Sequence, residues 1–365
     1  MTVVYTRTHF KFQDFYPLWG KSLLFCKGGI NMPIGLSVFL NILFLIIGMA
    51  LLIKGADFFV EGSSKVAKAL KIPSLIIGLT LVSIGTSLPE LSVSVNAALG
   101  GNADISYGNV VGSNIFNVYV VIGASALFTP MLVTKDMKKY DIPILIGIYV
   151  LFALFSFIIS PLKLSRIESI ILVVLFVGYL LFLVLRTLKT NKNNNQEDLE
   201  QNQENSKPRK MWVNILFIIL GLAGIIAGGE FVVTTAENLA LMAGMSKLLV
   251  GLTIVAVGTS LPELVTSMVA AKKGENDIAV GNAIGSSIFN ILLILGVASS
   301  LAPIGFEFNT IIDVVMMFIS AVMILLFALR KSTINRLHGI ILILVYVIYL
   351  TFIILRELNI INFVL

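Results

Sequence analysis

The sequence contains few charged residues, a single cysteine and only two histidines. Charged side chains make up 13% of the 365 residues, well below the share of about a quarter that is typical of a soluble globular protein. Because Cys26 is the only cysteine, no disulfide can form within the chain and no cysteine cluster can bind a metal. The HExxH and GxSxG motifs are absent, and both histidines lie far from the motifs described below. These absences argue against a soluble protein, a zinc enzyme and a serine hydrolase.

Long apolar runs dominate what is present. Hydrophobic residues make up 57% of the chain, and the mean hydropathy is +0.98. Since a spanning helix needs about 20 mostly apolar residues, the pattern predicts an all-α polytopic membrane protein with ten transmembrane helices. The expected spans lie near residues 34–53, 73–99, 105–128, 141–160, 167–186, 211–229, 246–271, 278–301, 310–329 and 337–356. The second and seventh are long and interrupted by polar residues, so we expect them to tilt or break.

The basic residues are unevenly distributed between the two sides of the predicted membrane. Eighteen of the 26 Lys and Arg residues follow the odd-numbered spans, and four lie on the opposite side. The positive-inside rule then predicts a multi-pass protein of the cell membrane with both termini outside. The formal charge of +6 is explained by this topology, so we expect no nucleic-acid partner, and no obligate protein partner is implied.

A polar segment divides the chain into two halves. Residues 190–209 read TNKNNNQEDLEQNQENSKPR, a composition that predicts a disordered cytoplasmic linker. It separates a first five-helix repeat, residues 32–189, from a second, residues 210–365. Residues 1–31 carry four basic side chains that fit poorly on the outer side, and we interpret them as a peripheral tail or an artefact of start-codon choice.

The two halves share a long repeat. Residues 78–117 reappear as residues 251–290 at a constant offset of 173, with 24 of 40 positions identical. Because each half has an odd number of spans, the second must enter the membrane with opposite polarity, which predicts inverted repeats with a substrate site at the midplane. Duplication for stability alone would not explain why the identities concentrate on polar residues inside spans.

The first motif in each repeat is Thr-Ser-Leu-Pro-Glu, at residues 86–90 and 259–263. Proline lacks an N–H group and crowds the carbonyl four residues earlier, so the helix should break there. The threonine and the glutamate are four residues apart and share one face. Carboxylate, hydroxyl and carbonyl oxygens are ligands of hard cations such as Ca²⁺ and Na⁺. The absence of sulfur and imidazole ligands argues against zinc, copper and iron.

The second motif places polar side chains at every fourth position of a glycine-containing helix. The stripes consist of Asn109, Ser113 and Asn117 in the first repeat, and of Asn282, Ser286 and Asn290 in the second. We expect Asn109 and Asn282 to bridge helices rather than bind an ion. The hydroxyl groups are either ligands or are bonded to their own helices.

Glu90 and Glu263 carry the strongest functional signal. Two acids cannot form a salt bridge with each other, and the neighbouring spans contain no Lys or Arg. Since an unpaired acid in hydrocarbon is costly, we predict that both bind a transported cation.

The first and sixth spans are short and contain glycine, so we expect them to slide and expose the site to either side. Asp57 and Glu230 match each other across the repeats, and we place both near the ends of these spans.

The paired sequences GTSLPEL and GN-x-x-GS-x-IFN resemble the alpha-repeats of sodium/calcium exchangers, within the cation/calcium exchanger superfamily. The resemblance is to the prokaryotic type and covers nearly all of residues 32–356. It implies a secondary antiporter, not an enzyme and without a cofactor, that exchanges Ca²⁺ for Na⁺ across the lipid bilayer by alternating access. The implied ligands are Thr86, Ser87, Glu90, Ser113, Asn117, Thr259, Ser260, Glu263, Ser286 and Asn290, with the backbone carbonyls of Ser83 and Ala256.

One position departs from the family pattern. Established exchangers usually carry aspartate where this chain has Asn290, so the site holds two carboxylates rather than three. One Ca²⁺ or two Na⁺ would neutralise them. Because of this departure, a Ca²⁺/H⁺ antiporter that uses the same two glutamates is the alternative function. A channel would differ from both antiporters by conducting without a counter-ion.

Overall fold

The structure, a computed structural model, describes residues 34–194, 210–245, 254, 256–305 and 310–357. The predicted tail at residues 1–31 and residues 195–209 of the predicted linker lie outside these ranges. The elements are α1 (Ile34–Ala69), α2 (Ser74–Ile77), η2 (Gly78–Val82), α3 (Ser83–Thr86), α4 (Leu88–Leu99), α5 (Ala103–Phe116), η3 (Asn117–Val121), α6 (Ile122–Phe128), β1 (Met131–Leu132), η4 (Met137–Asp141), α7 (Ile142–Leu154), η5 (Phe155–Ile159), β2 (Lys163–Leu164), α8 (Arg166–Asn194), α9 (Met211–Met242), α11 (Ala256–Gly258), α12 (Leu261–Lys272), α13 (Asn276–Phe289), η7 (Asn290–Leu295), α14 (Gly296–Leu301), β3 (Ile304–Gly305), α15 (Ile311–Lys331), β4 (Thr333–Ile334) and α16 (Arg336–Glu357).

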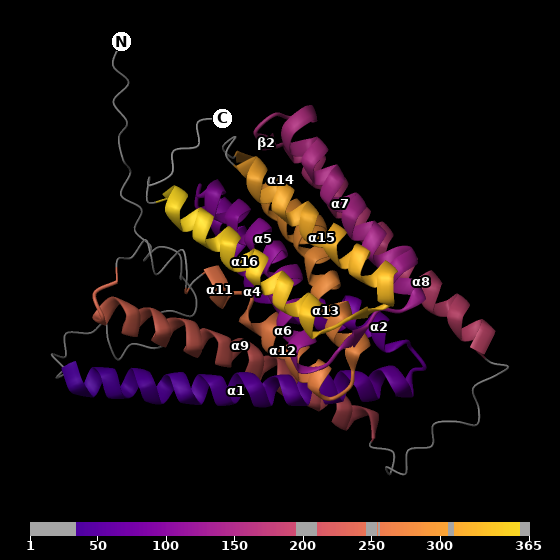
Figure 1. Cartoon of the computed structure of the whole chain (residues 1–365), viewed down its shortest axis with the longest axis horizontal. Coiled ribbons are helices and arrows are strands. Elements are labelled where there is room, and N and C mark those ends of the chain that lie inside the picture. Colours follow the sequence, from indigo (N-terminus) through magenta and orange to yellow (C-terminus); the bar gives the residue numbers. More distant parts are fainter. Residues whose placement is uncertain (1–33, 195–209, 246–253, 255, 306–309, 358–365) are drawn as a thin grey trace.

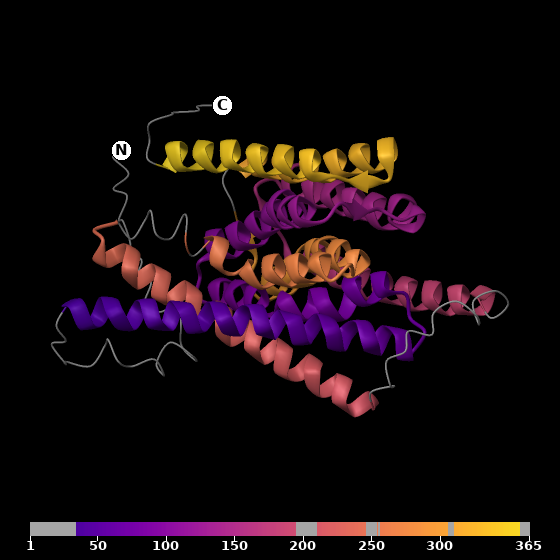
Figure 2. The ribbon, with the colours of Figure 1, turned by 60° about the horizontal axis from the view of Figure 1, so that its bottom comes forward.

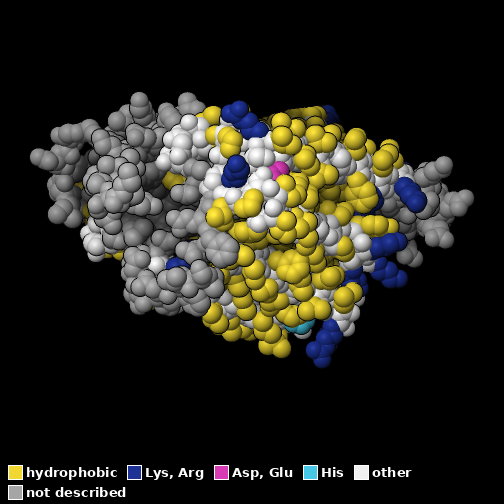
Figure 3. Space-filling model, turned by 90° about the horizontal axis from the view of Figure 1, so that it is seen from above, with side chains coloured by type: hydrophobic (Ala, Val, Ile, Leu, Met, Phe, Trp, Pro, Cys, Tyr) yellow, Lys and Arg dark blue, Asp and Glu magenta, His cyan; other side chains and the backbone are white. Residues whose placement is uncertain are grey.

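The described part of the chain is mostly helical, and its helices have the length and apolar composition of membrane spans. Eight helices are long and apolar enough to span one, and a ninth span is formed if the bent pair Ser74–Thr86 and Leu88–Leu99 is counted as one. The tenth expected span, near residues 246–271, includes residues 246–253 and 255, which lie outside the description. Hydrophobic side chains cover most of the described part of the face in Figure 3, with only isolated charges among them. Such a surface suits lipid contact.

The second expected span is broken, as its sequence predicts. Its two pieces, Ser74–Thr86 and Leu88–Leu99, are bent by 49° around Ser87. Pro89 lies in the first turn of α4, where its missing N–H removes no helical hydrogen bond. The motif therefore begins a new helix that has Glu90 in its first turn.

Helices α1 and α9 lie side by side along one side of the molecule (Figures 1 and 2) and form its most extensive helix pair. Glycines let their backbones approach closely. A Cβ atom on Gly55 would lie 2.6 Å from the Ile225 nitrogen, and one on Gly221 would lie 2.5 Å from the Phe59 nitrogen. The pair is antiparallel, because Asn238 near the end of α9 donates to Asn41 near the start of α1, at 3.2 Å.

The prediction that the first and sixth spans are short is wrong. Helix α1 has 36 residues and α9 has 32. Both continue past the charged residues at which the apolar runs end, so Asp57 and Glu230 lie well inside the helices rather than near their ends. Asp57 is tolerated there because it forms an ion pair with Lys273.

Helix α8 also extends further than the apolar run suggests. It continues to Asn194, five residues into the segment that we interpret as a linker.

Four two-residue strands connect the halves. Strand β1 pairs antiparallel with β4, and β2 pairs with β3. Each ladder joins one strand from before residue 190 to one from after residue 300. The span Asn276–Leu301, which comprises α13, η7 and α14, is the most enclosed of the described spans, since 94% of its most apolar stretch is buried. The repeated motifs are therefore at the centre of the bundle.

Candidate functional site

The two broken helices present their glutamates in the same way. Ser87 precedes α4 with φ −90° and ψ 9°, and Ser260 precedes α12 with φ −95° and ψ 6°. In each case a Leu-Pro-Glu sequence forms the first helical turn, so the carboxylate lies near a helix N-terminus, where the helix dipole favours negative charge. Both glutamates have no exposed surface.

Each glutamate accepts a hydrogen bond from the serine that precedes the glutamate-bearing helix of the other half. The Ser87 hydroxyl donates to Oε1 of Glu263 at 2.7 Å, and the Ser260 hydroxyl donates to Oε1 of Glu90 at 3.3 Å. The structure therefore brings together two acids that are 173 residues apart in sequence.

Several buried polar atoms of the repeated motifs have no hydrogen-bond partner within the described residues. They include Oε2 of Glu90 and Oε2 of Glu263, together with both amide atoms of Asn117 and of Asn290. Unsatisfied polar atoms are rare in protein interiors and costly when buried. Four unsatisfied oxygens from the two acids and the two amides make a set that suits a hard cation.

Other predicted residues bond to Ser260 and to the Ser83 carbonyl. Ser260 donates to the Ser113 hydroxyl at 3.0 Å, and Ser286 donates to the carbonyl oxygen of Ser83 at 3.4 Å. Thr86 also donates to the Ser83 carbonyl at 3.4 Å, besides a 3.1 Å bond to Val82 of its own helix.

Thr259 and Ala256 are two further residues of the predicted ligand set. Thr259 is half-buried and donates to Asn109 at 3.3 Å. Ala256 begins α11, and its side chain lies outside the description.

Asn282 and Asn109 bridge helices, as their positions predict. The Asn282 amide donates to the Glu263 carbonyl at 3.3 Å and to Ser267 at 2.9 Å, and its oxygen accepts from Thr86 of the other half at 3.1 Å. Asn109 makes the equivalent set with Glu90, Ser94 and Thr259. The bridges fix each glutamate-bearing helix against the opposite half.

Ser94 and Ser267 are site-supporting residues that the sequence interpretation missed. The signal was available, because both match across the repeat and lie four residues after the glutamates, on the same helix face.

Asn117 and Asn290 each begin a π-helical segment, η3 and η7. Such segments are rare and occur often at functional sites. Among the described residues, no group of three or more His, Cys, Asp and Glu side chains is arranged for a metal ion. A cation here would depend on two carboxylates and neutral oxygens.

Replacing Asn282 with alanine is expected to destabilise the protein. Asn282 is wholly buried, and its loss removes the hydrogen bonds that it makes with the Glu263 carbonyl, Ser267 and Thr86. The cost should be about 1–3 kcal/mol of unfolding free energy, measured by denaturant unfolding in detergent. The control is Asn96→Ala, since the Asn96 side chain bonds to Ser92 of its own helix, at 3.4 Å near the surface. Equal stabilities of the two variants would contradict the bridging role.

Comparison with known proteins agrees with the geometry. A family profile described as sodium/calcium exchanger protein matches residues 40–185 and 213–355. The chain belongs to the sodium/calcium exchanger family. The putative antiporter CaxA of Alkalimonas amylolytica is 40% identical over 311 residues, which cover 84% of this chain and 96% of CaxA. The sodium/calcium exchanger MaX1 of Methanosarcina acetivorans is 34% identical, with 85% and 97% covered.

The fold is also that of a solved exchanger. The structure of the sodium-calcium exchanger NCX_Mj soaked without Na⁺ and Ca²⁺ matches with a TM-score of 0.74 and 32% identity, and covers 87% of this chain and 99% of that one. This member of the sodium/calcium exchanger family is therefore a multi-pass membrane transporter of the cation/Ca²⁺ antiporter type, not an enzyme.

Proposed function

We propose that this exchanger family member trades Ca²⁺ for Na⁺ through one central site by alternating access. The observation that supports this best is the reciprocal pairing of Ser87 with Glu263 and of Ser260 with Glu90. It joins both halves around two acids whose second oxygens have no other partner among the described residues. Two carboxylates neutralise one Ca²⁺ or two Na⁺, so either load would compete for the same place.

Further oxygens complete the proposed ligand set. The core of the set consists of side-chain oxygens of Glu90, Glu263, Asn117 and Asn290, since each has a buried oxygen without a hydrogen-bond partner among the described residues. The others are the hydroxyls of Thr86, Ser87, Ser113, Thr259, Ser260 and Ser286, and the backbone carbonyls of Ser83 and Ala256. The hydroxyls of Ser87, Ser113 and Ser260 bond to one another or to a carboxylate, and a bound cation would replace those partners.

The repeats are proposed to form two inverted five-helix halves, ten spans in all, in the cell membrane. The antiparallel pairing of α1 with α9 and the ladders between the halves support this arrangement. Residues 32–189 and 210–365 would be the halves, residues 1–31 a peripheral tail and residues 190–209 a cytoplasmic linker, with both termini outside.

The experiment that tests this function is Ca²⁺ uptake into proteoliposomes under separate Na⁺ and proton gradients, with the membrane potential clamped. We expect an outward Na⁺ gradient to drive uptake and a pH gradient without Na⁺ to leave it at background. The names of relatives such as MaX1 support Na⁺ as counter-ion. Uptake driven by the pH gradient alone would instead establish the Ca²⁺/H⁺ alternative, and Ca²⁺ flux with neither gradient would indicate a channel.

A further inference from the structure

We propose that an ion-pair latch between α1 and the turn joining α12 to α13 holds one side of this transporter closed. The side is the one that the proposed topology assigns to the cytoplasm. The latch consists of Asp57 and Ser64 on α1, and of Lys273 and Glu275 on the turn. Its role as a conformational device rests on the proposed alternating access.

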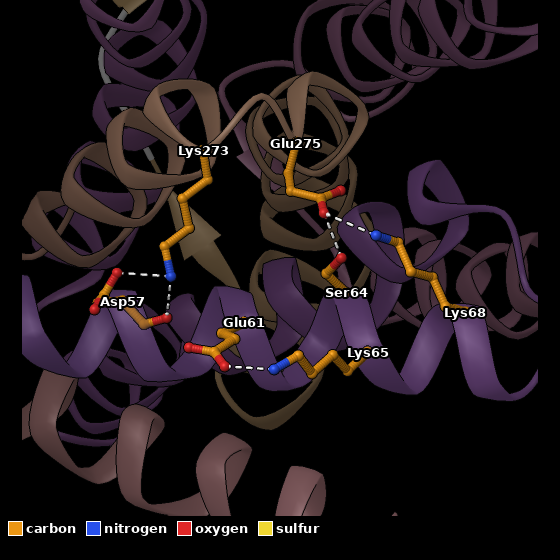
Figure 4. Close-up of polar contacts among 7 residues, drawn as sticks. All are labelled: Asp57, Glu61, Ser64, Lys65, Lys68, Lys273 and Glu275. Carbon is orange, nitrogen blue, oxygen red and sulfur yellow. Dashed lines mark hydrogen bonds and ion pairs between the residues drawn. The ribbon is translucent and has the colours of Figure 1, made fainter. Parts of the chain in front are cut away.

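The contacts are direct and come from two distant parts of the chain (Figure 4). The Lys273 ammonium lies 2.6 Å from Oδ1 of Asp57 and also donates to the Asp57 carbonyl at 2.9 Å. About two helical turns further along α1, the Ser64 hydroxyl donates to Oε1 of Glu275. The same oxygen lies 3.9 Å from the Lys68 ammonium. Two points of attachment, one through each charged residue of the turn, prevent α1 from rotating freely over it.

An apolar contact lies beneath the polar one. Val60 and Ala67 of α1 belong to one buried cluster with Ala270, Ala271 and Ile278 of α12 and α13. Ser63 lies on α1 between Val60 and Ala67 and has no exposed surface. We expect water to reach this buried contact when α1 separates from the turn, so a residue within it reports on the closure that the latch secures.

The latch joins the two bodies that alternating access must move relative to each other. One body is the antiparallel α1–α9 pair, which is packed tightly through its glycines. The other contains α12 with Glu263, and α13 and η7 with Asn282, Ser286 and Asn290. Because the turn links α12 directly to α13, any movement of α1 away from the site helices on this side must break both attachments.

Among the described residues, the repeat counterparts of Asp57 and Lys273 form no equivalent ion pair. The offset of 173 aligns Asp57 with Glu230, but it aligns Lys273 with Gly100 and Glu275 with Asn102. The turn between α4 and α5 therefore offers no cation to α9. An interaction present in only one of two otherwise matched states shifts the population toward that state. The latch thus favours the conformation that is closed at the Lys273 turn.

The test measures closure directly in the full-length protein. In a Cys26→Ser background, Ser63→Cys provides a nearly isosteric reporter in the closed contact. A membrane-impermeant maleimide is added to inside-out vesicles, and the modification rate is measured. A half-exposed ion pair of this kind shifts a two-state equilibrium by about fivefold at most, so we expect Lys273→Gln to raise the rate by about that factor. The exchanged pair Asp57→Lys with Lys273→Asp should bring the rate back toward that of the parent.

The matched control is Lys65→Gln. Lys65 follows Ser64 of the latch directly, but it pairs with Glu61 of the same helix at 2.6 Å and does not bridge the two bodies, so its removal should leave the rate unchanged. An unchanged rate in Lys273→Gln would overturn the proposal, as would an equal increase in Lys65→Gln. A failed rescue by the exchanged pair would also overturn it if the thermal midpoint is that of the parent. Labelling requires no ion exchange, so these outcomes are separate from a failure of the proposed function.

Discussion

Glu90→Gln and Glu263→Gln are each expected to reduce Ca²⁺ uptake by about 100-fold or more. Glutamine keeps the size and the hydrogen-bond acceptor of glutamate but removes one of two charges from a buried site. At 4 Å, the attraction between unit charges is worth about 4 kcal/mol at an effective dielectric constant of 20, and a divalent ion would lose more. The measurement is Na⁺-driven ⁴⁵Ca²⁺ uptake into proteoliposomes, normalised to the amount of reconstituted protein.

Conservative variants separate the loss of charge from the loss of fold. Glu61→Gln changes the same residue type on α1, where Glu61 pairs with Lys65 within the helix, and it should retain uptake. Each site variant should also keep the parent's thermal midpoint in detergent without Ca²⁺. Normal exchange in either Glu90→Gln or Glu263→Gln would show that the two acids do not hold the transported ion together.

Exchange by the wild-type protein is expected to be electroneutral, with two Na⁺ for each Ca²⁺. The central region contains two carboxylates, while the neighbouring Asn117 and Asn290 are neutral and wholly buried. A third Na⁺ would leave a net positive charge where the surroundings have a low dielectric constant. Moving one net charge changes the driving force by about 2.3 kcal/mol per 100 mV, which is about 50-fold in the Ca²⁺ accumulation ratio. For the wild-type protein, we expect the Ca²⁺ accumulation ratio not to depend on the membrane potential.

A potassium diffusion potential set with valinomycin provides the measurement. The accumulation ratio of the wild type should stay constant between 0 and 100 mV, whereas Asn290→Asp adds a third carboxylate and should make the ratio depend on voltage. Asn214→Asp is the control, because Asn214 is a buried asparagine of α9 outside the proposed ligand set. A voltage-dependent wild type would mean that the charge count of the site does not fix the stoichiometry.

Local sequence determined the parts of this fold that depend on neighbouring residues. Apolar length identifies the spans, since backbone groups in lipid must be satisfied within a helix. The proline of the Leu-Pro-Glu sequence identifies the break, because it can occupy the first turn of a helix but not its interior. The exact repeat identified both glutamates, and it also marked Ser94 and Ser267, whose role became clear only from their contacts with Asn109 and Asn282.

Helix length was predicted poorly where charges interrupt the apolar pattern. Hydropathy ends the first span at Lys54, yet α1 continues to Ala69. A charged residue within a membrane helix is costly unless it has a partner or reaches the interface, and Asp57 has Lys273 as its partner. That partner is 216 residues away, so no window along the chain could include it.

The sequence alone determined a membrane protein with two similar halves, each carrying a broken helix that bears one acid. Tertiary structure alone decided which oxygens meet, namely Ser87 with Glu263 and Ser260 with Glu90, and that α1 is fastened to the turn at Lys273. The physical reason is that helix formation and breakage follow from short-range sterics and hydrogen bonding, whereas these contacts depend on how two distant segments pack against each other.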